Sequence, residues 1–129
     1  MTYTILSPET KIFVLPELLS SCKEEEFTLI HCDCWPEFDF TWINIQATTY
    51  LTNPVSQETL PLLTTMGILI FPQRYWLKIP GEHIQFTLVF DKIPPSWQSF
   101  DLIEPSPDYP FEFLNIKRNN TGVYRIKTV

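Results

Sequence analysis

Residues 83–90, HIQFTLVF, decide the fold. Their apolar and polar side chains alternate, so that one face of an extended chain carries Ile84, Phe86, Leu88 and Phe90, and the other carries His83, Gln85, Thr87 and Val89. A period of two belongs to a β-strand, whereas an amphipathic helix repeats about every 3.6 residues. The segment therefore predicts a strand with one side against an apolar core.

Short runs of strand-forming residues fill most of the remaining chain. Twelve prolines and three glycines interrupt the sequence so evenly that a long helix has no room. We expect further strands at residues 2–6, 11–15, 27–34, 38–50, 60–64, 75–79, 99–103, 111–117 and 123–128. Gly81 and Glu82 predict a hairpin turn between residues 75–79 and 83–90. A short helix is plausible only at residues 16–23.

These elements predict a single all-β domain over residues 1–129. A chain of 129 residues is long enough to bury a core and too short for two ordinary domains. Many short strands separated by turns are typical of sandwiches and barrels. We therefore expect an immunoglobulin-like antiparallel β-sandwich of about eight strands, with at most one short helix.

A series of motifs within residues 42–116 carries a resemblance. In chain order they are Thr49-Tyr50-Leu51, Leu60-Pro61-Leu62-Leu63, Gly67-Ile68, Phe86-Thr87-Leu88-Val89-Phe90, Ile93-Pro94, Ser99-Phe100-Asp101-Leu102-Ile103-Glu104 and Phe113-Leu114-Asn115-Ile116. Together they resemble the small, uncharacterised immunoglobulin-like β-sandwich modules of Bacteroidota and related bacterial proteins, which usually lie outside the cytoplasm. The resemblance implies a fold and carries over no catalytic residue.

The charge of the chain disfavours two classes of partner. Fifteen acidic residues against nine basic ones give a formal net charge of -6. Such a surface repels phosphate backbones and anionic membranes. Because no apolar run approaches the roughly 20 residues of a membrane span, we expect no membrane insertion either. Another protein or a second copy of the chain remains as the expected partner, and a sugar is possible.

Cysteine usage and the amino terminus bear on localisation. The sequence has three cysteines, Cys22, Cys32 and Cys34, and residues 1–11 lack the basic and apolar regions of an export signal. We therefore expect reduced thiols and a cytoplasmic protein for the chain as written. Removal of a signal peptide would instead mean a protein outside the cytoplasm.

The three cysteines and His31 form the one cluster that suits a soft metal such as Zn²⁺. On a strand, however, Cys32 and Cys34 share a face with Ile30, and buried free thiols explain that placement equally well. Since the sequence has no second cysteine pair, we expect neither a metal nor another cofactor.

Catalytic residues are not recognisable in the sequence. The available bases are His31 and His83, and Cys34 lies three residues from His31, on the opposite face of a strand. The carboxyl groups of Asp101 and Glu104 also fall on opposite faces. We expect local roles for them, with Asp101 accepting backbone donors near the loop at residue 94 and Glu104 capping the loop at residue 105. The chain is therefore not expected to be an enzyme.

Trp97, Tyr109 and Trp35 are the candidate binding residues. Trp97 and Tyr109 lie in proline-rich loops, where we expect exposed rings, although a loop aromatic more often pins its own loop. Trp42 and Trp76 fall inside expected strands and are assigned to core or half-buried positions.

The hypothesis that follows is a non-enzymatic protein-interaction or accessory module whose edge strands or proline-rich loops contact another protein. A carbohydrate-binding module that uses the loop aromatics is the alternative. The fold does not choose between them, since sandwiches carry many unrelated functions.

Overall fold

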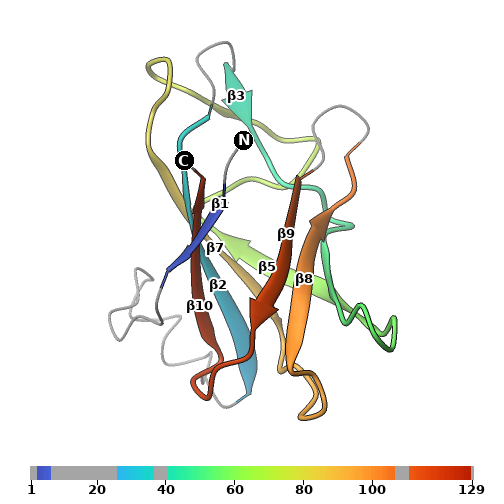
Figure 1. Ribbon diagram of the computed structural model, residues 1–129. Helices are drawn as coiled ribbons and strands as arrows, with labels where there is room; N and C mark the ends of the chain where they lie inside the picture. The colour runs from blue at the N-terminus through green and yellow to red at the C-terminus, as the bar shows by residue number, and fades with distance from the viewer. Residues whose placement is uncertain (1–2, 7–25, 37–40, 107–110, 129) are drawn as a thin grey trace.

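The computed structural model describes residues 3–6, 26–36, 41–106 and 111–128, and these residues form strands, turns and loops (Figure 1). Ten strands occur in them: β1 (Tyr3–Leu6), β2 (Phe27–Cys34), β3 (Trp42–Ile43), β4 (Tyr50–Thr52), β5 (Thr59–Met66), β6 (Tyr75–Trp76), β7 (Ile84–Asp91), β8 (Ser99–Glu104), β9 (Phe111–Lys117) and β10 (Val123–Thr128). The all-β prediction is confirmed. The expected strand at residues 11–15 and the expected helix at residues 16–23 lie outside the described residues.

Eight strands form one sheet in the order β1-β10-β2-β7-β5-β4-β8-β9, and β3 and β6 form a second, small sheet. The large sheet curls, so that β8 and β9 lie across from β10, β2 and β7 in two layers (Figure 1). This arrangement confirms the sandwich. Within it, β10 and β2 run parallel, while the other strand pairs are antiparallel.

The core lies between the two layers and follows the alternation that the sequence predicts. On β7, Ile84, Leu88 and Phe90 are buried, and Leu88 and Phe90 belong to one core cluster with the buried Phe100 and Leu102 of β8. Burying such side chains stabilises the fold by about 1.5–3 kcal/mol each. The apolar period of residues 83–90 is thus the contact between the layers.

The predicted hairpin between residues 75–79 and 83–90 is wrong. β7 is paired on one edge with β2 and on the other with β5, so it has no free edge for residues 75–79. β6 pairs with β3 instead. The Glu82 carboxylate accepts hydrogen bonds from the Tyr75 hydroxyl at 2.7 Å and from the Lys78 backbone N–H at 2.6 Å, which closes the intervening chain into a loop.

Residues 38–50 do not form the single strand that we expect from the sequence. Their described part contains β3, an isolated parallel bridge between Ile45 and Ile70, a turn closed by the bond from Thr49 N to Gln46 O, and the first residue of β4. Gly67 turns the chain after β5 with a φ of +81°, and a Cβ there would lie 2.8 Å from the Gln85 carbonyl oxygen. The turn therefore requires glycine.

Candidate functional site

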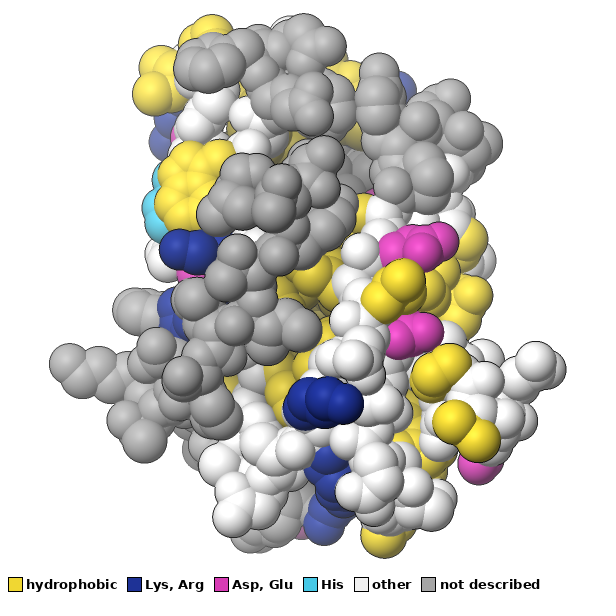
Figure 2. All heavy atoms as spheres, viewed as in Figure 1, with side chains coloured by type: hydrophobic (Ala, Val, Ile, Leu, Met, Phe, Trp, Pro, Cys, Tyr) yellow, Lys and Arg dark blue, Asp and Glu magenta, His cyan; other side chains and the backbone are white. Residues whose placement is uncertain are grey.

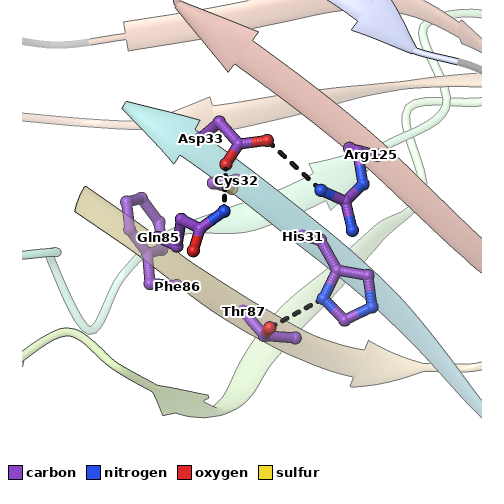
Figure 3. A pocket seen from close by; sticks show the side chains of 7 residues that line it. All are labelled: His31, Cys32, Asp33, Gln85, Phe86, Thr87 and Arg125. Atoms are coloured by element: carbon purple, nitrogen blue, oxygen red, sulfur yellow. Dashed lines mark hydrogen bonds and ion pairs between the residues drawn. The ribbon is translucent and has the colours of Figure 1, made fainter. Parts of the chain in front are cut away.

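Two groups of side chains are candidates for function, and the first lies on the outer side of β2, β7 and β10. The register places His31 opposite Thr87 and Asp33 opposite Gln85, with Arg125 of β10 beside His31. Because alternate residues of a strand share a face, these five side chains converge (Figure 3). We call them the polar cluster.

Asp33 is the centre of the polar cluster. One carboxylate oxygen accepts hydrogen bonds from Gln85 Nε2 at 2.8 Å and pairs with His83 Nε2 at 3.1 Å. The other pairs with Arg125 Nη1 at 3.4 Å. Burial by itself would raise the pKa of Asp33, but the hydrogen bonds from Gln85 and His83 and the charge of Arg125 outweigh it and lower that pKa. Asp33 is therefore held as a carboxylate.

His31 is buried beside this ion pair and remains neutral. Its Nδ1 shares a hydrogen bond of 2.8 Å with Thr87 Oγ1, while its Nε2 is buried and has no hydrogen-bond partner among the described residues. Burial, with a smaller contribution from the positive charge of Arg125, lowers the pKa of His31 to about 4. A neutral imidazole next to a buried guanidinium is an expected result of desolvation.

The cavity in the polar cluster is small. It measures about 10 Å³ and is lined by the cluster together with Cys32 and Phe86. That volume accommodates about one water molecule. The polar cluster can therefore hold buried charges and one water molecule on this side of the sheet, but it has no room for a sugar ring or a peptide side chain.

Trp35 lies at the edge of the polar cluster. Its ring stacks on the His83 ring with 4.3 Å between centroids and 5° between planes, and His83 in turn contacts Asp33. Trp35 is 43% exposed. One face of this indole is therefore occupied by His83, and it is half available to solvent.

The second group lies on the small sheet formed by β3 and β6. Trp42 and Trp76 are directly opposite each other, so they share a face, and Arg74 shares it as the residue two positions before Trp76. The Arg74 guanidinium lies 4.3 Å from the centre of the Trp42 ring, a cation–π contact. We call Trp42, Arg74 and Trp76 the aromatic face.

The opposite side of the small sheet is directed toward the sandwich. Ile43 packs against the core cluster, and the Tyr75 hydroxyl is bonded to Glu82. Backbone bonds from Leu77 N to Thr41 O and from Phe71 N to Ile45 O, each 2.9 Å, attach the segment to its neighbour. The aromatic face is thus a fixed outer surface, and the small sheet lies at one end of the sandwich (Figure 1).

The segment that carries Arg74 and Trp76 contains further exposed apolar side chains. Trp76 is 61% exposed, and three other large hydrophobic side chains between positions 69 and 79 are also exposed: Leu69, Phe71 and Ile79. This concentration was not expected from the sequence, in which Trp76 was assigned to a core or half-buried position. The signal that could have found it is the pair Arg74 and Trp76 at a spacing of two on a very short strand.

The prediction that Trp97 is exposed is wrong. Trp97 is completely buried, because the loop before β8 turns its indole into the core. A backbone bond from Trp97 N to Pro94 O at 3.0 Å closes that loop, and Arg118 Nη1 donates to both the Pro94 and Trp97 carbonyl oxygens. Trp97 pins its own loop. Tyr109 lies outside the described residues.

Asp101 and Glu104 point to opposite faces of β8, as predicted. Asp101 accepts a hydrogen bond from Asn115 N of β9 at 2.8 Å, so its backbone donor lies across the strand pair and not in the loop at residue 94. Glu104 is buried and accepts from Gln46 N at 2.9 Å, so it does not cap the loop at residue 105. Burial raises the pKa of Glu104 to about 7.

The thiols of β2 face inward as the alternation predicts. Cys32 is buried, which raises the pKa of its thiol, and Cys34 is partly buried. Within the described part of the chain, no group of three or more His, Cys, Asp or Glu side chains is placed to hold a metal ion. Cys22 lies outside the described residues.

Comparisons with protein-family models, with curated proteins and with solved structures found no match for this chain. The resemblance to Bacteroidota sandwich modules therefore stays a prediction. No helix in the described residues has the length and apolar character needed to cross a membrane.

Proposed function

We propose that this chain is a non-enzymatic protein-interaction module that binds its partner through the aromatic face. The observation that carries the proposal is the outward position of Trp42, Arg74 and Trp76, with Trp76 61% exposed on a small sheet fixed by backbone hydrogen bonds. Tryptophan and arginine dominate the binding energy of many protein interfaces. A rigid surface of these residues loses little conformational entropy on binding.

The exposed apolar side chains near the aromatic face support the same conclusion. Leu69, Phe71 and Ile79 are exposed in the segment that carries Arg74 and Trp76. A concentration of exposed large apolar side chains on a small domain commonly marks a contact with another protein. By contrast, we assign a structural role to the polar cluster, because its cavity of about 10 Å³ admits no substrate larger than water.

Sugar binding is the second candidate function, and Trp76 is the observation that favours it. With Trp97 buried, Trp76 offers the large exposed ring that stacking on a sugar requires. We expect protein binding to be the stronger hypothesis because Arg74 already covers the neighbouring Trp42 ring. Titration of tryptophan emission against a panel of glycans tests the alternative, and unchanged emission with every glycan would remove it.

Site-specific photo-crosslinking tests the protein-binding proposal. A photoreactive aromatic amino acid, which keeps a ring at the contact, replaces Trp76 in one variant and Val55 in a matched control, since Val55 is 91% exposed in a turn between β4 and β5. We expect a discrete protein adduct from position 76 that position 55 does not give, and loss of that adduct when Arg74 is changed to Glu. Identical adducts at both positions, or none at position 76, would contradict the proposal.

A further inference from the structure

A second exposed surface lies on the outer side of β4, β5, β8 and β9. The register places Pro61, Tyr50, Ile103 and Glu112 in one row across four neighbouring strands. None of these four side chains is buried. The row therefore presents apolar groups that end at a carboxylate on the edge strand β9.

The next positions along β8 and β9 add a second carboxylate and a further apolar side chain. A shift in register places Leu114 and Asn115 opposite Asp101, and Leu114 is 57% exposed. Figure 2 shows acidic and apolar side chains side by side over β8 and β9. We call Tyr50, Ile103, Leu114, Asp101 and Glu112 the acidic face; Lys117 lies beyond it, at the far end of β9 opposite Ser99.

The charge of the aromatic face is opposite to that of the acidic face. Residues 67–82 contain Arg74, Lys78 and one acidic residue, Glu82, whose carboxylate bonds Tyr75 and the Lys78 backbone, so their net charge is 2 − 1 = +1. The rest of the chain holds 15 − 1 = 14 acidic residues and 9 − 2 = 7 basic ones. In a strongly acidic protein, the exposed segment that carries the aromatic face has a net positive charge, and Arg74 is the member of the aromatic face that carries it.

We propose that the aromatic face of one copy docks on the acidic face of a second copy, in a head-to-tail contact. The proposal rests on the proposed function and names its partner. Arg74 would meet Asp101 and Glu112, while the apolar side chains of the two surfaces cover one another. Each surface supplies what the other lacks, an apolar area with the opposite charge beside it.

Charge selects this contact over a symmetric one. Two aromatic faces in contact would place Arg74 of one copy against Arg74 of the other, and two acidic faces would place carboxylates together. Within one copy, the small sheet lies at one end of the sandwich, while β8 and β9, which carry the two carboxylates of the acidic face, lie along its side (Figure 1). Because the two surfaces differ, the contact is heterologous and leaves one free surface of each kind on every pair.

Sedimentation velocity of the purified chain tests the inference. We expect wild-type protein to form species larger than a dimer as its concentration rises, and to dissociate as salt rises, because the charges at the contact are exposed. The variants Arg74→Glu and Glu112→Arg should each weaken self-association by more than about tenfold, since each places like charges at the contact. Circular dichroism verifies that each variant remains folded.

Mixing the two variants gives the decisive result. Arg74→Glu retains a working acidic face and Glu112→Arg retains a working aromatic face, so an equimolar mixture should associate although neither variant does so alone. The two altered faces carry exchanged charges and complement each other, so the mixed species should grow with concentration as wild type does. The double variant, with both changes in one chain, should regain association because its charges are exchanged. Lys92→Glu and Glu58→Arg are controls that make the same charge changes at exposed positions outside both faces.

Wild-type protein that stays monomeric at every concentration would overturn the inference, as would self-association that survives both charge reversals. A different protein crosslinked at position 76 by a chain that is monomeric on its own would overturn the self-contact while leaving the proposed function intact. Failure of the mixed variants to associate, with both folded and wild type associating, would also count against this geometry.

Discussion

The polar cluster and the aromatic face contain similar chemical groups and differ in their surroundings. Both place an arginine beside a ring: Arg125 lies beside His31, and Arg74 lies over Trp42. Arg125, however, is 6% exposed and paired with Asp33, whereas Arg74 lies at the surface. Charges in the interior act on the stability of the fold, because removing one leaves the other desolvated. Charges at the surface act on partners. Exposure, more than composition, separates the two regions.

The largest expected effect on stability comes from removing the charge at the centre of the polar cluster. Asp33→Ala takes away the carboxylate that bonds Gln85, His83 and the buried Arg125. We expect the free energy of unfolding to fall by about 3–5 kcal/mol, measured by urea denaturation. Asp91→Ala, at an exposed position on the same sheet, is the control. Equal losses in the two variants would show that the polar cluster is not structural.

A second effect concerns Glu104, a buried titratable group outside both regions. Its pKa is raised to about 7 in the folded protein, so the folded state binds a proton more tightly than the unfolded state. The contribution is fully present below pH 4.5 and is lost as pH rises toward 7, by about 3 kcal/mol. Glu104→Gln should remove this contribution, so urea denaturation at several pH values should show the variant gaining stability relative to wild type between pH 4.5 and 7. A stability difference between the two proteins that stays constant over that window would refute the assignment.

His31 of the polar cluster should act with the opposite sign. Its folded pKa is lowered to about 4 from 6.5, so the unfolded chain takes up the proton first as pH falls. Stability is present above pH 6.5 and declines between pH 6.5 and 4, by an amount of the same order as for Glu104. Wild type should therefore be nearly flat where the two windows overlap. His31→Gln exposes the Glu104 slope there; an unchanged profile would contradict this explanation.

The regular strands could be predicted from the sequence because their information is local. Alternation and breaker residues predict strands at residues 27–34, 111–117 and 123–128. These ranges are the bounds of β2, β9 and β10 in the structure. The polar cluster could not be predicted in this way. Asp33 and Arg125 are 92 positions apart, and only the parallel pairing of β2 with β10 brings them together.

The tryptophans show why local context failed for the candidate site. Trp97 was expected to be exposed because it lies in a loop, but the closure of that loop buries it. Trp76 was expected to be at least half buried because it lies in a strand, but β6 has two residues and none of the described strands covers its outer side, where Trp76 is 61% exposed. Exposure depends on how layers stack, and stacking is not contained in the pattern of one segment.

The smallest expected effect on stability belongs to the residue on which the proposed function depends most. Trp76→Ala removes a ring that is 61% exposed, so the free energy of unfolding should change by no more than about 0.5 kcal/mol. The same change should abolish the partner contact, since an exposed tryptophan beside an arginine is a typical binding hot spot. Urea denaturation and sedimentation of the same samples separate the two quantities, with Val55→Ala as the matched control. A Trp76→Ala protein that lost stability and binding together would place Trp76 with the polar cluster, as a structural residue.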